Sequence, residues 1–289
     1  MGRLAVVIAS LFLLGAVPAA AEAAAPVTST VQKTVTVRAG GVTSVALRCP
    51  AAAVALNGSA VPLGSGALAR DSQPVGDTPG RWVFRFVASG DSGSRRARAV
   101  LRCVRLRLPS GVSGARLNVM SADTGFESVA AGTSRLFTLA CDPGFVPTGW
   151  GVERRGAGAR RLRVTRAAPT ANGWVLQFEN ASSAAAGGRF HIRCLERRQT
   201  ATTGQRHTFR TRRARFSEAG RRRAAKHSCR RSEFSVSTGF SVAPARDIRL
   251  VSAQPLGTRG ARWRFDNEPA RNKPVKTYLV CLDRTTGFR

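Results

Sequence analysis

The sequence predicts an all-β protein made of three tandem, small antiparallel β-sandwich units, each closed by one disulfide. Three observations lead to this fold class. Six cysteines fall into successive pairs that are separated by 54, 53 and 52 residues. Short runs with alternating apolar side chains, typical of half-buried strands, precede the second cysteine of each pair. Glycine and proline interrupt the chain between these runs, and no stretch has a convincing helical period.

Residues 1–23 have the layout of a secretory signal peptide. A positively charged start is followed by an uncharged apolar run at 4–17, and the small residues after Pro18 allow cleavage after Ala21 or Ala23. A membrane anchor is the alternative, but this run is shorter than the ~20 residues that a spanning helix needs. We therefore expect an exported chain, in the periplasm, on the cell surface or secreted, with no transmembrane segment after cleavage.

The remaining chain divides into three units, residues 24–108, 109–198 and 199–289, with a period of about 85–90 residues. Glycines recur at the same spacing from the cysteines. Nine residues before the first cysteine of each unit lie Gly40, Gly132 and Gly220. After the first cysteine of each unit, a further glycine occurs in the strings LNGSAV, PTGWGV and STGFSV. Because several independent features share one period, the sequence indicates tandem repeats.

Six cysteines allow fifteen disulfide pairings, and the repeat favours the one in which each unit closes on itself. The predicted bridges are Cys49–Cys103, Cys141–Cys194 and Cys229–Cys281. An exported chain permits disulfides, and closing a loop of ~50 residues stabilises a small unit by roughly 4 kcal/mol in the chain-entropy model. A zinc site is the less favoured alternative, because it requires closely spaced ligand pairs such as Cys-x-x-Cys, which the sequence lacks.

The strand pattern is clearest at residues 173–180, where Trp174 and Phe178 alternate with the outward Gln177. The same alternation recurs at 81–88 and 262–267. In each unit the later strand that carries the second cysteine has apolar neighbours on the cysteine's own face. A buried aromatic beside an inter-sheet disulfide is the arrangement of immunoglobulin-like sandwiches. We therefore predict that the three units are immunoglobulin-like.

Two of the units carry a recognisable repeat pattern. The first contains CP…NG…GRWVF…RC, and the second contains CDPGFVPTGWGV…APTANGWVLQFENAS…IRCL. This pattern resembles a tandem Cys-Pro-Gly, Gly-Trp, Asn, Cys repeat of mostly uncharacterised exported proteins of GC-rich bacteria. The third unit departs from it, since 221–229 lacks apolar alternation before its cysteine. The resemblance implies a non-catalytic extracytoplasmic module and carries no known site residues.

The sequence offers little for catalysis, and we expect neither an enzyme nor a cofactor. The string SGDSGS at 89–94 resembles the nucleophile loop of chymotrypsin-type proteases, with Ser92 in the place of the serine. In that family, however, the histidine and aspartate precede the serine, whereas every histidine of this chain follows it. Glycine, aspartate and serine are also ordinary turn residues. We interpret the string as a turn between strands.

The three histidines show no pairing with a carboxylate by spacing. His191 is predicted to point outward beside Arg193, and His207 to be exposed in a basic stretch. His227 lies two residues before a cysteine, where burial is possible. None of them is predicted to be a catalytic base or a metal ligand.

The chain is strongly basic, with 46 Lys and Arg against 16 Asp and Glu and a net charge of +30. A positive field of this size attracts polyanions. The charge is densest at 206–231, which holds eleven Arg or Lys and one Glu. The candidate polyanion-binding residues there are Arg210, Arg212, Arg213, Arg215, Arg221, Arg222, Arg223 and Lys226. The alternative is a solvated loop and edge strand, whose charge discourages aggregation.

These observations predict an exported, non-catalytic binding or structural surface protein built from disulfide-stapled β repeats. The alternative is a secreted polyanion-binding protein that uses segment 206–231 on an anionic envelope polymer or a nucleic acid. Phe209 and Phe216 are the only aromatic residues in that segment, which provides little for base stacking. Anionic polymers or surfaces are the expected partners.

Overall fold

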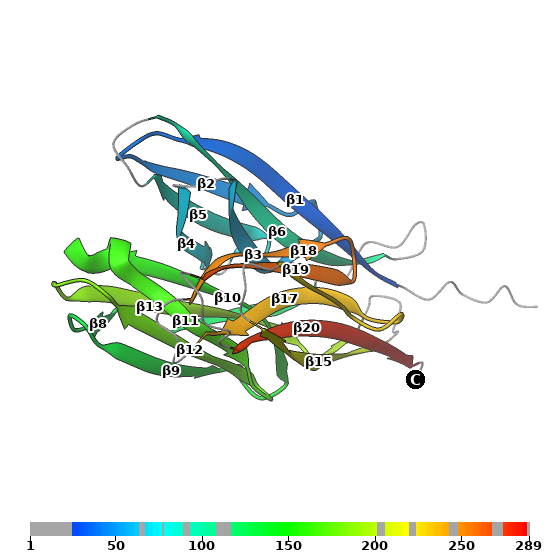
Figure 1. The fold of residues 1–289 in the computed structure, drawn as a ribbon. Helices are drawn as coiled ribbons and strands as arrows, with labels where there is room; N and C mark the ends of the chain where they lie inside the picture. Colours follow the sequence, from blue (N-terminus) through cyan, green and yellow to red (C-terminus); the bar gives the residue numbers. More distant parts are fainter. Residues whose placement is uncertain are drawn as a thin grey trace, which may run out of the picture.

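The computed structural model describes residues 25–63, 67–76, 78–88, 93–107, 117–200, 206–219, 224–242, 248–267 and 274–287. The predicted signal peptide lies outside these ranges. The described residues are nearly all β, with antiparallel pairing between the strands and one short 3-10 helix (Figure 1). No helix of the described chain is long and apolar enough to cross a membrane.

We refer to residues 24–108, 109–198 and 199–289 as the first, second and third segments. The first contains β1 (Ala25–Val37), β2 (Val42–Arg48), β3 (Val54–Leu63), β4 (Ala67–Pro74), β5 (Arg81–Ala88) and β6 (Arg95–Arg107). The second contains β7 (Val119–Asp123), β8 (Glu127–Val129), β9 (Ser134–Ala140), β10 (Phe145–Arg155), the 3-10 helix η1 (Ala157–Arg161), β11 (Leu162–Pro169), β12 (Gly173–Asn180) and β13 (Ala186–Glu196). After β14 (Arg198–Thr200), the third contains β15 (Arg206–Ala219), β16 (Ala224–Ser228), β17 (Phe234–Ser241), β18 (Ile248–Leu256), β19 (Gly260–Asn267) and β20 (Pro274–Gly287).

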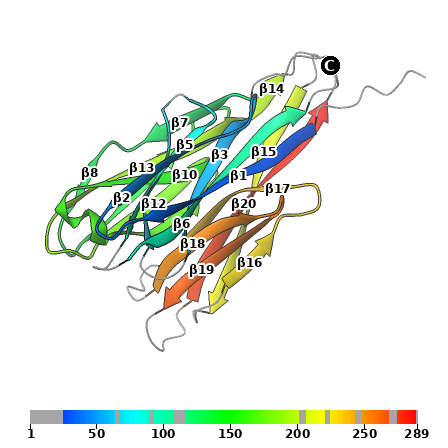
Figure 2. The same ribbon diagram turned by 90° about the horizontal axis from the view of Figure 1, so that it is seen from above.

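The order of hydrogen-bonded strands recurs from segment to segment. One set of three strands runs β1-β6-β3 in the first segment, β7-β13-β10 in the second and β15-β20-β17 in the third. The other set runs β2-β5-β4, β9-β12-β11 and β16-β19-β18. Figure 2 shows the last of these sets, β16, β19 and β18, side by side. Each segment thus has the same pairing, although the third has the weakest sequence pattern.

The sheets do not stop at the segment boundaries. β4 pairs with β10, and β11 pairs with β17, so two sheets of seven strands each run from one segment into the next. β18 of the third segment in turn contacts β3 of the first. Each of the three segments therefore packs against both of the others. The sequence did not indicate this arrangement.

The three predicted disulfides are confirmed, with S–S distances of 1.97, 2.05 and 2.04 Å. In each segment the first cysteine follows the outer strand of one sheet, and the second lies in the middle strand of the other. Gly40 and Gly132, which precede these outer strands, have φ values of 68°. Such a positive φ favours glycine, which explains why glycine recurs at this turn.

The predicted core strands are confirmed as well. Trp82 in β5, Trp174 in β12 and Trp263 in β19 are fully buried in the three segments. Each lies in the middle strand of its set of three. Gln177, predicted to face outward from β12, is partly exposed. One hydrophobic cluster joins the second and third segments and reaches Val54 of the first, so the core is continuous across the segments.

Arg102 lies on the face of β6 opposite to Cys103, which alternation along the strand alone would assign to solvent. It is 2% exposed, because the face of β6 that carries it is covered by the third segment. Its Nη2 donates to Ser235 Oγ at 3.0 Å and to the Gly257 carbonyl at 2.6 Å, and its Nη1 donates to Thr30 Oγ1 at 3.0 Å. Burial lowers the pKa of Arg102 to about 10. The side chain ties the first segment to the third.

Candidate functional site

The basic segment 206–231 is divided between two sheets. β15 lies in a seven-stranded sheet, whereas β16 pairs with β19 in a separate three-stranded sheet. The exposed members of the predicted set are Arg210, Arg213 and Arg215 on β15 and Lys226 on β16. Arg221, Arg222 and Arg223 lie outside the described residues. The structure therefore places four of the predicted residues on one strand, three of them exposed.

Arg212 has a different environment from its neighbours on β15. Its Nε and Nη2 donate to the two carboxylate oxygens of Glu233, both at 2.5 Å. The Glu233 carboxylate also accepts a hydrogen bond from the backbone amide of Arg230 at 2.9 Å. The Arg212 hydrogen bond lowers the pKa of Glu233. A bidentate pair of this kind is strong and directional, so Arg212 fixes the turn after Cys229.

β15 has an open edge along much of its length. It pairs with β20 from Arg206 to Ala219, while β14 covers the opposite edge only from Arg206 to Thr208. Among the described residues, no strand pairs with the rest of that edge. Charged side chains on an edge strand discourage sheet-to-sheet association. The same side chains present guanidinium groups to an anion, those of Arg213 and Arg215 on one face of the strand and that of Arg210 on the other.

His191 and His207 correct the sequence analysis, since both are buried. His191 lies on a face of β13 next to Arg193, whose guanidinium lies 6.0 Å from the ring of Trp82 in the first segment. The face that alternation assigns to solvent is thus covered by another segment. Burial lowers the pKa of His191 to about 4, although Asp123 opposes this effect. Burial also lowers the pKa of His207.

His227 is partly buried between aromatic rings. Its imidazole stacks on Phe216 with 3.5 Å between ring centroids, and it lies 5.4 Å from Trp263. This stacking connects β15 to β16 across the third segment. Ser92, the residue in the protease-like string, lies outside the described residues.

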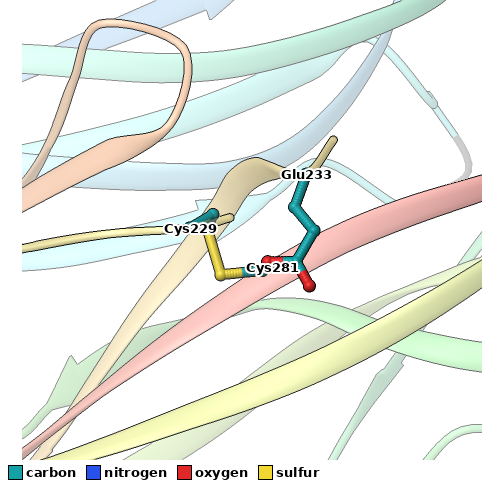
Figure 3. A group of neighbouring side chains, drawn as sticks. All are labelled: Cys229, Glu233 and Cys281. Carbon is teal, nitrogen blue, oxygen red and sulfur yellow. A yellow bond between two sulfur atoms is a disulfide. The ribbon is translucent and has the colours of Figure 1, made fainter. Parts of the chain in front are cut away.

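Cys229, Glu233 and Cys281 have potential metal-ligand atoms that all lie within 4.8 Å of one another. Figure 3 shows why they do not form a metal site: the two sulfur atoms are joined in a disulfide, and the glutamate carboxylate lies beside them. A metal requires the free thiolate. The carboxylate is moreover already bound by Arg212.

Buried charges join the first segment to the second. Arg85 of β5 lies 3.4 Å from Asp71 Oδ2 and 3.1 Å from Glu153 Oε1 of β10. Asp71 Oδ1 also accepts a hydrogen bond from the backbone amide of Arg154 at 2.9 Å. Burial raises the pKa of Asp71, and the neighbouring arginines oppose this effect. The charges at this junction hold β4 against β10.

A cavity of about 840 Å³ lies where β3, β4, β10, β11, β17 and β18 meet. All three segments contribute to its wall. Its lining includes six arginines and three acidic residues, together with serine, threonine and aromatic side chains. Sequence reasoning missed this site, because no single segment contains it.

Three β-bulges point to a common design of this cavity. Each of β4, β11 and β18 has one extra residue that is left out of the pairing with its neighbour. The extra residues are Arg70, Thr165 and Val251. All three line the cavity. Bulges re-aim side chains and are common beside functional sites.

The recurrent glycines behind the first cysteines allow the segments to approach closely. A Cβ at Gly149 of β10 would collide with the carbonyl oxygen of Leu56 in the first segment. A Cβ at Gly239 of β17 would collide with the carbonyl oxygen of Ala167 in the second. These glycines were visible in the sequence as part of the repeat, and they were its one signal of contact between segments.

No protein-family model matches the chain, and a search of curated proteins finds no match.

Proposed function

We propose that the chain is an exported, non-catalytic binding or structural surface protein built from three immunoglobulin-like units. The observation that carries this proposal is the recurrence of one strand order in the three segments, each with a disulfide between its two sets of strands. Disulfides persist in oxidising compartments outside the cytoplasm, which supports export through residues 1–23. We further propose that the units belong with the tandem repeats of exported bacterial proteins that the sequence resembles.

The placement of the ionisable side chains supports a non-catalytic role. His191 and His207 are buried and have lowered pKa values, so neither presents a base to solvent. Arg102 binds groups of the third segment, and Arg85 binds Glu153 of the second. The charges nearest the segment junctions thus stabilise the packing of the units, which suits a rigid protein that presents surfaces to a ligand.

Export and binding are tested together with the secreted protein. We expect residues 1–23 to direct an oxidised, mature chain out of the cytoplasm, and a chain without them to stay inside with reduced cysteines. Labelled heparin and duplex DNA should bind saturably at low salt and be recovered chemically unchanged. Cleavage or modification of either probe by the purified protein would contradict the non-catalytic role.

A second candidate function is polyanion binding by the edge of β15. The observation that favours it is the exposure of Arg210, Arg213 and Arg215 along one open edge. Their joint replacement by Gln removes three charges and leaves the Arg212–Glu233 pair intact. On duplex DNA, log affinity falls with log salt by ~0.9 per phosphate neutralised, so we expect a slope flatter by about two to three.

The matched control replaces three exposed arginines of the first segment, Arg38, Arg48 and Arg105, by Gln. It changes the net charge by the same amount on a different segment from β15. If binding is local to β15, this control keeps the wild-type salt slope. Equal flattening by both triple variants would show that the whole surface attracts the polyanion, and the β15 edge would then have no special role.

A further inference from the structure

The cavity between the three segments has the dimensions of a small-molecule site. Ligand pockets typically enclose about 300–1,000 Å³, and this cavity encloses about 840 Å³. Its wall comes from β3 and β4 of the first segment, β10 and β11 of the second and β17 and β18 of the third. It therefore exists only in the assembled chain and is distinct from the open edge of β15.

Two buried polar atoms in the lining have no hydrogen-bond partner among the described residues. They are Oδ1 of Asn57, a residue that is 5% exposed, and Oγ1 of Thr165, a residue that is 8% exposed. Buried polar atoms in folded proteins are nearly always satisfied. Asn57 lies in β3, and Thr165 is the extra residue of the bulge in β11. Both residues line the cavity, so a rotation of either side chain would bring its polar atom to a ligand hydroxyl.

Positively charged donors line the same cavity. The buried Nε atoms of Arg70 and Arg154 donate no hydrogen bond to the described residues, although Arg70 Nε lies 3.8 Å from Asp71 Oδ2. One Nη of each side chain donates to a backbone carbonyl. Arg160, Arg161 and Arg249 are exposed members of the lining. Asp71, an acid of the lining, is already bound by Arg85 and by a backbone amide. The lining holds six arginines against three acidic residues, and this net positive charge suits an anionic group.

Aromatic side chains complete the wall. Trp150 and Phe240 both line the cavity, with 6.1 Å between their ring centroids. The indole of Trp150 is held by a hydrogen bond from its Nε1 to the Thr238 carbonyl at 2.7 Å. A fixed aromatic wall with a few polar groups is the usual composition of a small-molecule site.

We propose that this cavity binds a small hydroxylated acid, a sugar phosphate or a sugar carboxylate, at the junction of the three segments. The arginines around Arg70 and Arg154 hold the phosphate or carboxylate. Asn57 Oδ1 accepts a hydrogen bond from a ligand hydroxyl, and Thr165 Oγ1 bonds a second. Trp150 and Phe240 pack against the carbon skeleton of the ring. This inference deepens the proposed binding role and does not depend on β15.

The test is isothermal titration of the secreted protein with glucose 6-phosphate, glucuronate, glucose and inorganic phosphate. We expect one equivalent of glucose 6-phosphate or glucuronate to bind, and the tighter of the two identifies the preferred acidic group. Neutral glucose should bind at least tenfold more weakly, because it lacks the charge that the arginines bind. Inorganic phosphate should also bind at least tenfold more weakly, because it lacks the ring and its hydroxyls.

Two cavity variants and one control separate this site from general charge attraction. Arg70→Gln should weaken binding of the preferred acid about tenfold or more, as loss of a charge-assisted hydrogen bond does. Thr165→Val should weaken it about fivefold, and it should fold normally because it removes a hydroxyl that has no partner. Arg213→Gln, on the exposed face of β15, removes the same charge as Arg70→Gln and should leave the affinity unchanged. Thermal melts identify any variant that fails to fold.

Several results would overturn the proposal. They are no binding of either acid at about 10 mM, glucose binding as tightly as the acids, and inorganic phosphate binding as tightly as the sugar phosphate. Equal weakening by Arg70→Gln and Arg213→Gln would also overturn it. If Arg70→Gln does not fold, wild-type affinity in Thr165→Val is sufficient to reject the site. Each of these results leaves the polyanion test of β15 unaffected, so the two proposals can fail separately.

Discussion

Arg102→Met tests whether the buried guanidinium holds the first segment to the third. Methionine keeps most of the length and bulk of the side chain, so the change removes mainly the charged head and its three hydrogen bonds. Those bonds reach Thr30, Ser235 and Gly257. Ser235 and Gly257 belong to the third segment, where β17 and the turn after β18 lie. The variant therefore weakens the contact between the first and third segments.

The expected change in the free energy of unfolding follows from two opposing contributions. Hydrogen bonds to a charged group contribute about 1.5–3 kcal/mol each, so three contribute roughly 4–9 kcal/mol. Burial lowers the pKa of Arg102 from 12.5 to about 10, and at 1.36 kcal/mol per pKa unit this desolvation costs about 3 kcal/mol. The difference spans about 1–6 kcal/mol, and we expect Arg102→Met to lower the free energy of unfolding by about 2–4 kcal/mol.

Urea unfolding followed by tryptophan fluorescence measures this loss, with disulfides intact. Arg105→Met is the matched control, because Arg105 is an exposed arginine of the same strand, and surface changes usually stay within about 0.5 kcal/mol. Hydrogen exchange should also show faster exchange in β3 and β18 for Arg102→Met alone. Equal effects of the two variants, or a gain in stability from Arg102→Met, would show that this residue does not hold the first segment to the third.

Three further predictions concern the core, acid stability and the basic strand. Trp174→Ala should lower the free energy of unfolding by about 3–5 kcal/mol, whereas Gln177→Ala in the same strand should be nearly neutral by urea unfolding; similar small effects of both would contradict the facing of β12. The pKa of His191 falls from 6.5 to about 4 on folding, so its contribution to stability is present above pH 6.5 and is lost as pH falls toward 4, by about 3 kcal/mol in all. Stability measured from pH 7 to pH 4 should therefore decline less in His191→Gln, and an unchanged decline would show that another group controls the acid sensitivity. Arg212→Gln should lower the melting temperature because it leaves the Glu233 carboxylate without its bidentate partner, while Arg213→Gln should not; the reverse order would contradict the division of roles along β15.

Local sequence patterns were sufficient for the interior of each segment. Alternation identified Trp82, Trp174 and Trp263 as core residues, because successive side chains of a strand point to opposite faces. Cysteine spacing identified the disulfides, because each bridge closes within one repeat. These features depend on residues close to one another along the chain or on a repeated period.

The packing between segments could not be read in the same way. Alternation shows which face of a strand meets its own partner sheet, but it does not show whether another segment covers the other face. Arg102 and His191 therefore lie buried on faces that alternation alone would assign to solvent. The cavity escaped prediction for the same reason, since Asn57 and Thr165 come from different segments. Only the recurrent glycines, such as Gly149 and Gly239, marked the contacts between segments.

Non-reducing peptide mapping of the secreted protein by mass spectrometry is the most direct test. It asks whether the chain is exported and whether each unit forms its own disulfide. We predict an N-terminus at Glu22 or Ala24, following cleavage after Ala21 or Ala23. We also predict the bridges Cys49–Cys103, Cys141–Cys194 and Cys229–Cys281. An uncleaved N-terminus at Met1, free thiols in the mature protein or a bridge between two segments would contradict these predictions.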